Sequence, residues 1–179
     1  MTIKSFLSLL FASMTLLTIY AGKGYCAENI HWELAVGPGL NVDGNHTSQI
    51  LIAPAISLQS PKQWLKYRIE SNLELIDSDG RITAVIGAAP FLRFYMLNGE
   101  KKPFFEIGAG ANVISRNNTG NKNSGGSFIF SVMGGAGYEF TLYERPVAVS
   151  CRFRHISNAC IYPHNESINN LYLLFSIGL

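Results

Sequence analysis

The sequence carries little charge. Only 15% of its 179 residues are Asp, Glu, Lys or Arg, and the formal net charge is +2. A soluble sandwich of strands would present abundant Lys and Glu to water, so this composition disfavours that class. The near balance of 14 basic and 12 acidic residues also excludes the strongly basic surface that a nucleic-acid partner selects.

Cysteine and long apolar runs are scarce as well. Three cysteines occur in the chain, and Cys151 and Cys160 are too far apart in an extended segment to meet the Cα limit of roughly 7 Å for a disulfide. We therefore expect free thiols. Beyond the N-terminal region no apolar run reaches the roughly 18 residues of a spanning helix, so residence in a membrane would require a barrel of strands.

Residues 1–27 have the layout of a secretory signal peptide. A lysine precedes a long apolar run, and small residues follow it. We expect cleavage after Ala27, with Gly22 and Gly24 as alternative ends of the signal. The mature domain is then 28–179, which is an ordinary size for a single domain.

The rest of the chain alternates between apolar and polar residues, which is typical of strands with two unlike faces. In LKYRIESNLEL, residues 65–75, most odd positions are apolar and most even positions are polar or charged. Eight such segments occur, of about the length that a tilted membrane crossing needs. We therefore predict an all-β fold, an eight-stranded antiparallel transmembrane β-barrel. Turn signals between segments stand at 43–46, 60–63, 77–80, 97–102 and 115–126.

Charged residues gather on one face of these segments, and the other face is almost free of charge. A polar inside and an apolar outside are typical of small membrane barrels, in which opposite charges can neutralise one another in the bore. The charged positions expected inside are Glu33, Lys66, Arg68, Glu70, Glu74, Arg81, Arg93, Glu106, Glu139, Arg152 and Arg154.

Glycines and aromatic residues fit the same architecture. The glycine-rich stretches 108–112 and 134–140 lie inside strand segments, where we interpret them as room for bulky side chains in the bore. A phosphate loop would need a following helix. Candidates for the aromatic belts at the membrane boundaries are Trp32, Trp64, Tyr67 and Tyr95.

Two polar residues interrupt an apolar face near the end of the seventh segment. Val149, Cys151 and Phe153 define this face, and His155 and Ser157 continue it. Ionisable residues on a lipid-facing surface are costly and therefore indicate function. If both chain ends lie in the periplasm, this segment runs outward, and the pair lies at the outer-leaflet boundary. The acyl esters of lipopolysaccharide lie near this depth.

The pair has the chemistry of an ester hydrolase. A serine hydroxyl is a weak nucleophile unless a neighbouring base removes its proton. Residues two apart on a strand have Cα atoms about 6.6 Å apart, a gap that an imidazole can span. A structural interpretation stays open, in which His155 and Ser157 bond loop backbone in a non-catalytic barrel that serves adhesion or membrane structure.

The stretch RHISNACIYPHN at 154–165, followed by an alternating final segment, resembles the lipid A 3-O-deacylases of the PagL type. The resemblance implies a barrel in the outer membrane of a Gram-negative cell. It implies lipopolysaccharide as the substrate, hydrolysis of the ester-linked 3-hydroxyacyl chain at the 3 position of lipid A, no metal or cofactor, and it allows a homodimer. A phospholipase that uses the same nucleophile is the enzymatic alternative.

The resemblance also implies roles for single residues. By position His155 is the general base and Ser157 the nucleophile. Asn158 and Asn165 match asparagines that support the family's site, and Asn165 is the candidate for oxyanion stabilisation.

The third catalytic member departs from the family. The family's Glu falls on Asn169, the first outward residue of the last segment. An Asn oxygen can still accept from the His155 ring and fix its tautomer, as in Cys-His-Asn enzymes, although it lacks the charge. Glu166, three residues earlier, is the alternative.

Overall fold

The structure is a computed structural model that describes residues 30–44, 47–97, 99 and 101–179. The expected signal peptide and its cleavage site lie outside the described residues. No helix in the described part of the chain has the length and apolarity needed to cross a membrane.

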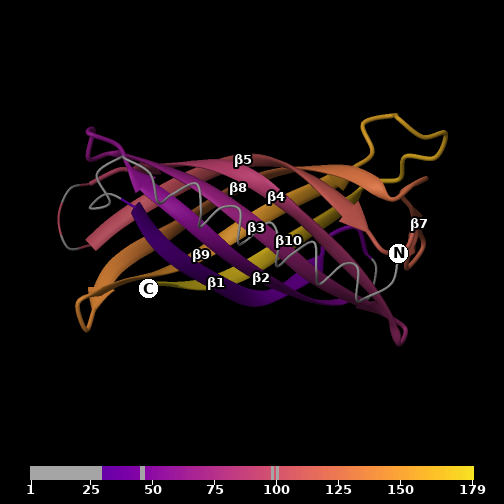
Figure 1. Ribbon diagram of the computed structural model, residues 1–179. Helices are drawn as coiled ribbons and strands as arrows, with labels where there is room; N and C mark the ends of the chain where they lie inside the picture. Colours follow the sequence, from indigo (N-terminus) through magenta and orange to yellow (C-terminus); the bar gives the residue numbers. More distant parts are fainter. Residues whose placement is uncertain (1–29, 45–46, 98, 100) are drawn as a thin grey trace.

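Eight long strands form one closed antiparallel barrel (Figure 1). Their bounds are Ile30–Asn41 (β1), Ser48–Gln59 (β2), Leu65–Ser78 (β3), Arg81–Tyr95 (β4), Lys101–Ile114 (β5), Phe128–Leu142 (β8), Arg145–Ser157 (β9) and Ile168–Gly178 (β10). Each pairs with its neighbours along the chain, and β1 pairs with β10 to close the wall. The predicted architecture is confirmed.

A two-stranded hairpin lies in the loop between β5 and β8. It consists of Asn118–Thr119 (β6) and Lys122–Asn123 (β7). The sequence pattern predicts only a loop here, because strands of two residues are too short to show any alternation.

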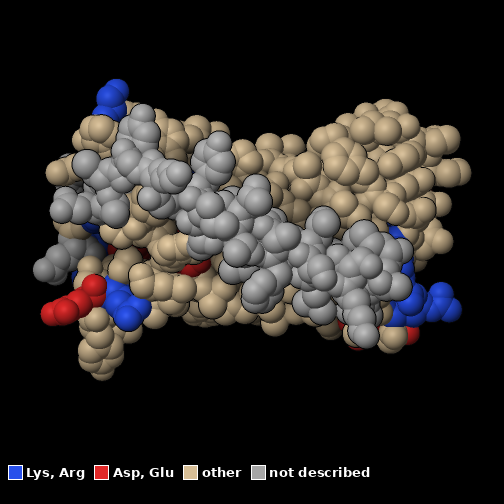
Figure 2. All heavy atoms as spheres, in the orientation of Figure 1, with Lys and Arg blue, Asp and Glu red and all other residues tan. Residues whose placement is uncertain are grey.

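Side chains alternate between the bore and the outside along the barrel strands. In β3, Lys66, Arg68 and Glu70 are buried, whereas Tyr67 and Ile69 are exposed on the outside. On the side seen in Figure 2, most of the visible Lys, Arg, Asp and Glu atoms lie at the two ends, and the part of the wall that is visible between them is largely uncharged. An apolar outer band of this kind matches the hydrocarbon of a bilayer.

Buried ion pairs fill the middle of the bore. Arg152 binds Glu70 and Glu106, each at 2.6 Å, and Arg154 binds Glu74 at 2.6 Å. Five acidic and five basic side chains are buried here, so their formal charges cancel: Glu33, Lys66, Arg68, Glu70, Glu74, Arg93, Glu106, Glu139, Arg152 and Arg154. The expectation for Arg81 is wrong. As the first residue of β4 it lies at the rim beside a turn and is exposed.

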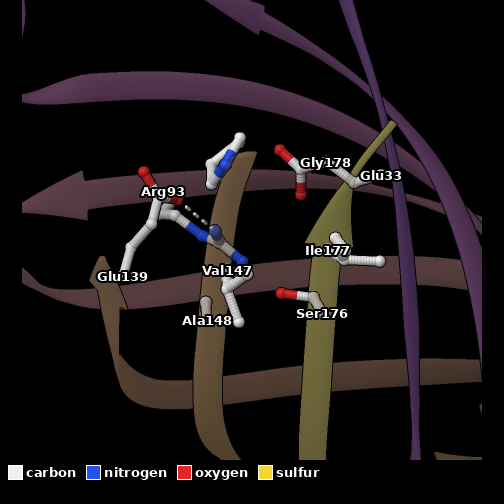
Figure 3. Close-up of a pocket in the computed structure, with 9 residues that line it drawn as sticks. Glu33, Arg93, Glu139, Val147, Ala148, Ser176, Ile177 and Gly178 are labelled. Carbon is white, nitrogen blue, oxygen red and sulfur yellow. Dashed lines mark hydrogen bonds and ion pairs between the residues drawn. The ribbon is translucent and has the colours of Figure 1, made fainter. Parts of the chain in front are cut away.

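The two ends of the bore differ. At the end where β9 finishes, a cluster of six aliphatic side chains closes it, formed by Ile76, Val85, Ile114, Ile129, Ile156 and Ile168. Near the other end a small pocket lies beside Glu33, Arg93 and Glu139, and Figure 3 shows Arg93 directed at Glu139, 3.1 Å away. Side chains therefore pack the bore, and chemistry on a lipid has to take place on the outer surface.

The glycines of β5 and β8 make room for aromatic rings in the bore, as predicted. A Cβ at Gly108 would lie 2.6 Å from the Phe91 ring, and one at Gly137 would lie 2.6 Å from Cζ of Phe104. Real Cβ atoms do not approach other atoms so closely, so these rings need glycine opposite them.

Three of the four aromatic residues expected at the membrane boundaries lie on the outside. Trp64 and Tyr67 are exposed, and Trp32 is on the outward face of β1. The prediction for Tyr95 is wrong, because its ring lies in the bore and its hydroxyl donates a hydrogen bond of 2.7 Å to Glu139. The parity of β4 places it there, two residues after the inward-facing Arg93.

The barrel has one end with the chain terminus and one end with the longer loops. The N–H of Leu179 donates to the carbonyl of Trp32 at 2.8 Å, so the C-terminus lies where β1 begins. The connections 115–127 and 158–167 lie at the opposite end (Figure 1). In outer-membrane barrels the longer loops face the exterior, so we call this the external end. Cys151 and Cys160 are exposed free thiols, as expected.

Candidate active site

His155 and Ser157 lie on the outer face of β9, at its external end. Their neighbours on the strand, Arg154 and Ile156, are 0% and 1% exposed and point into the bore. His155 and Ser157 are both half-buried and, by the alternation of β9, point to the other side. This is the orientation that strand parity predicted, toward lipid and away from the ion pairs of the bore.

The ring of His155 is held by the neighbouring strand. His155 and Asn169 are directly opposite each other in the β9–β10 ladder. Nδ1 of His155 lies 2.7 Å from Oδ1 of Asn169. Because the amide oxygen can only accept, Nδ1 is the protonated ring nitrogen and Nε2 carries the free lone pair. A ring in this tautomer can take a proton at Nε2.

Asn169 is itself held by Asp43, which the sequence pattern places only in the turn at 43–46. Nδ2 of Asn169 donates to Oδ1 of Asp43 at 2.8 Å, and the backbone N–H of Asn169 donates to Oδ2 at 2.9 Å. The carboxylate thus binds both donors of one residue. The position of Asp43 beside Asn169 depends on the register between β1 and β10, the two strands that close the barrel. The two residues are more than 120 positions apart in the chain.

The end of β1 fixes Asp43 in turn. The backbone N–H of Asp43 donates to Oδ1 of Asn41 at 2.9 Å, an Asx-type turn. The backbone N–H of Val42 and Nδ2 of Asn41 both donate to the carbonyl of Asn169, at 2.9 and 3.1 Å. Backbone and side-chain bonds therefore tie Asp43 to the residue that holds His155.

The Ser157 hydroxyl makes no hydrogen bond within the described part of the chain. It is therefore not saturated by loop backbone, which the structural interpretation of the pair would require. Catalytic hydrogen bonds are often long in free enzymes and shorten when substrate binds.

Strand β8 supplies an apolar surface beside the pair. In the β8–β9 ladder Val132 is opposite His155, and Phe130 is opposite Ser157. Val132 is 60% exposed, and the ring of Phe128 packs edge-on against Phe130 at 5.1 Å between centroids. A hydrocarbon chain lying along the wall can contact these side chains while its ester reaches the hydroxyl.

Asn158 and Asn165 organise the loop that follows Ser157. Asn158 is fully buried, and its Nδ2 donates to the carbonyls of Ser124 and His164 at 2.7 and 2.5 Å. Oδ1 of Asn165 accepts from the backbone N–H of Asn158 at 2.9 Å. These bonds join the β9–β10 loop to the β5–β8 loop.

Glu166 lies in the same loop but binds elsewhere. Its Oε2 accepts from the backbone N–H of Asn123 at 2.6 Å, and its own N–H donates to the Asn123 carbonyl at 3.0 Å. The carboxylate therefore caps the β6–β7 hairpin, while the His155 ring is bonded to Asn169. No group of three or more His, Cys, Asp or Glu suited to a metal ion is found among the described residues.

Comparisons with known proteins identify the family and the fold of the chain. The family described as lipid A 3-O-deacylase (PagL) matches residues 53–177. The crystal structure of the outer membrane enzyme PagL is similar with a TM-score of 0.65 and 23% identity, over 80% of this chain and 97% of that one. Neisserial surface protein A is similar with a TM-score of 0.57 and 12% identity, over 84% and 94%. No curated protein matches the chain.

Proposed function

This chain belongs to the PagL family of lipid A 3-O-deacylases, and from that premise we propose that it removes the ester-linked 3-hydroxyacyl chain from the 3 position of lipid A by a Ser-His mechanism. The observation that carries the proposal is the outward position of His155 and Ser157 at the external end, with His155 Nδ1 bonded to Asn169. Because side chains fill the bore, only the outer face of this barrel can present a nucleophile to a membrane lipid.

The proposed reaction begins when the Ser157 oxygen attacks the ester carbonyl. Nε2 of His155 accepts the hydroxyl proton and then gives it to the departing sugar oxygen, which leaves an acyl-Ser157 intermediate. Water from the external side, deprotonated by the same nitrogen, then hydrolyses the acyl-enzyme. The proton taken from water passes from Nε2 to the Ser157 oxygen as the fatty acid leaves, so the enzyme is restored and one water molecule is consumed in each cycle.

Asn169 takes the place of the family's glutamate as the residue that orients His155. Its oxygen holds the ring in the tautomer that leaves Nε2 free, although a neutral amide cannot directly compensate the charge on an imidazolium. We propose that Asn158 supports the loop. Nδ2 of Asn165 donates a hydrogen bond of 3.4 Å to Sγ of Cys160. We propose this nitrogen as the donor to the oxyanion.

The proposed setting follows from the family and the fold. Residues 1–27 are removed on export, and the barrel 28–179 resides in the outer membrane with lipopolysaccharide as its substrate and without a cofactor. A homodimer in the membrane is compatible with the proposal, because the site lies on one arc of the wall formed by β8, β9 and β10.

Mass spectrometry of lipid A tests the proposal. Cells expressing the wild type should lose one hydroxyacyl chain, and Ser157→Ala or His155→Ala should reduce the loss at least about 10³-fold. Matched controls are Ser48→Ala and His31→Ala, which alter an exposed serine at the external end and an exposed histidine at the other end.

The other functions are outcomes of the same experiment. Intact lipid A in every strain, with purified barrel inert on phospholipid vesicles, would identify a non-catalytic barrel. Hydrolysis of phospholipid in place of lipid A would identify a phospholipase. Either result would overturn the proposal.

A further inference from the structure

We propose that Asp43 is a positioning residue for the reaction, and that it acts through Asn169 to supply the acid that the His155 site otherwise lacks. The inference rests on the proposed function. Asp43 lies in the turn just after β1, whereas His155 lies on β9 and Asn169 on β10. These side chains form a His155–Asn169–Asp43 chain of hydrogen bonds.

The first step is the orientation of the amide. A carboxylate accepts hydrogen bonds and cannot donate one at neutral pH. Oδ1 of Asp43 lies 2.8 Å from one end of the Asn169 amide, so that end is the nitrogen. The amide oxygen is thereby turned toward His155, and the alternative, flipped amide would leave its oxygen facing a carboxylate oxygen.

The second step is the tautomer of the histidine. With the amide oxygen of Asn169 facing it at 2.7 Å, Nδ1 of His155 has to donate. Nε2 is left as the acceptor that a general base needs. Without Asp43 the amide could turn over, and its NH₂ group would then stabilise the opposite tautomer, which has no free Nε2.

The third step concerns charge. Hydrogen bonds in a chain polarise one another, so a carboxylate behind the amide makes the amide oxygen a stronger acceptor. Asp43 therefore stabilises the imidazolium that forms during attack. It acts through Asn169, whereas the family's glutamate would bond the ring directly. This accounts for an active site that has an asparagine where the family has an acid.

Asp43 also fastens β1 to β10, and a purely structural role has to be separated from positioning. Substitution experiments on the full-length barrel in lipid A micelles can do this. Asp43→Ala removes the charge and both acceptor oxygens, and Asp43→Asn removes the charge and one of the two acceptors. We expect kcat to fall about 100-fold and about 10-fold respectively, with KM changed less than about threefold. The matched control is Asp77→Asn, an exposed acid at the external end of β3, which should keep full activity.

An exchange of the two residues gives the sharpest test. Asn169→Asp alone places two carboxylates together, which is unfavourable. Asn169→Asp combined with Asp43→Asn restores one acid and one amide, with the acid now bonded directly to His155. We expect each single substitution to lower kcat. In the double variant kcat should return to within about threefold of the wild-type value. The exchange also restores the hydrogen bond between positions 43 and 169, so under a purely structural tie kcat would change only in parallel with the free energy of unfolding, in the single variants as in the double one.

A spectroscopic readout completes the test. With ¹⁵N-labelled histidine, and with the His155 signals assigned from His155→Ala, the neutral ring should show only Nδ1 protonated in the wild type and a tautomer mixture in Asp43→Ala. Full activity and an unchanged tautomer in both Asp43 variants would overturn the inference. Full activity in Ser157→Ala would overturn the proposed function itself, so the two failures are distinguishable.

Discussion

The inward and outward side chains of β9 use polar groups in opposite ways. Arg152 and Arg154, which face the bore, each bind one or two carboxylates and are almost completely buried. His155 and Ser157 face the outside. Within the described residues they make a single side-chain hydrogen bond, from His155 to Asn169. Saturated polar groups hold a scaffold, whereas a hydroxyl that lacks a partner at the lipid boundary is available for chemistry. Substitutions on the two sides should therefore affect different quantities.

The largest effect on stability is expected from the inner side. Arg152→Met removes the guanidinium that binds the carboxylates of Glu70 and Glu106. Glu70 is then left with Arg68, whose Nη2 lies 3.4 Å from Oε2 of Glu70. Breaking one side of a buried pair typically costs about 3–5 kcal/mol in the free energy of unfolding. Urea unfolding in micelles measures this loss, and the folded fraction should keep its kcat. Adding Glu70→Gln should recover part of the stability. A variant as stable as the wild type would contradict the assigned role of the ion pairs.

On the outer side, Asn169→Ala should reduce activity without changing stability much. Loss of the group that fixes the His155 tautomer is expected to lower kcat about 10²-fold, with KM nearly unchanged. Deacylation kinetics on purified lipopolysaccharide measure both constants. An equal rise in KM would instead mean that Asn169 contacts the substrate in its ground state.

Packing of the bore gives an intermediate effect. Gly108→Val drives a branched side chain into the Phe91 ring and should cost about 1–3 kcal/mol of unfolding free energy. The same urea titration measures it. Phe91→Ala in the same chain should remove most of that extra cost, because it empties the space that the valine enters. Additive losses in the double variant would show that the two positions are not in contact.

The smallest effect is expected at Glu166. Its carboxylate binds the Asn123 backbone in the β6–β7 hairpin, so Glu166→Ala should change kcat by less than about threefold. Side-by-side kinetics with Asn169→Ala decide between the two candidates for the His155 orienter. A Glu166→Ala variant as slow as Asn169→Ala would assign the role to the loop carboxylate.

The sequence predicts the fold well, because inward and outward residues alternate along each barrel strand with a period of two. That pattern placed Lys66 and Arg152 inside and His155 and Ser157 outside, and it failed at Arg81 only because a strand end at the rim faces water. The resemblance to the deacylase family, carried by the stretch around Ser157, is confirmed by the family match.

Asp43 could not be found in this way. Its position beside Asn169 depends on the register between the first and last strands, which barrel closure sets and no local pattern encodes. In the sequence it is one residue of a DGNH turn, where aspartate is common for purely local reasons. The order of contacts in the structure, from His155 to Asn169 to Asp43, is the only sign of its involvement.

The most direct measurement is covalent labelling of the nucleophile. A long-chain alkyl fluorophosphonate, which reacts with activated serine hydroxyls, is incubated with the purified barrel in micelles, and the modified peptide is located by mass spectrometry. We expect one label, on Ser157, that disappears in His155→Ala and weakens in Asn169→Ala. A barrel that deacylates lipid A while Ser157 stays unlabelled, or a label that persists without His155, would contradict the Ser-His mechanism.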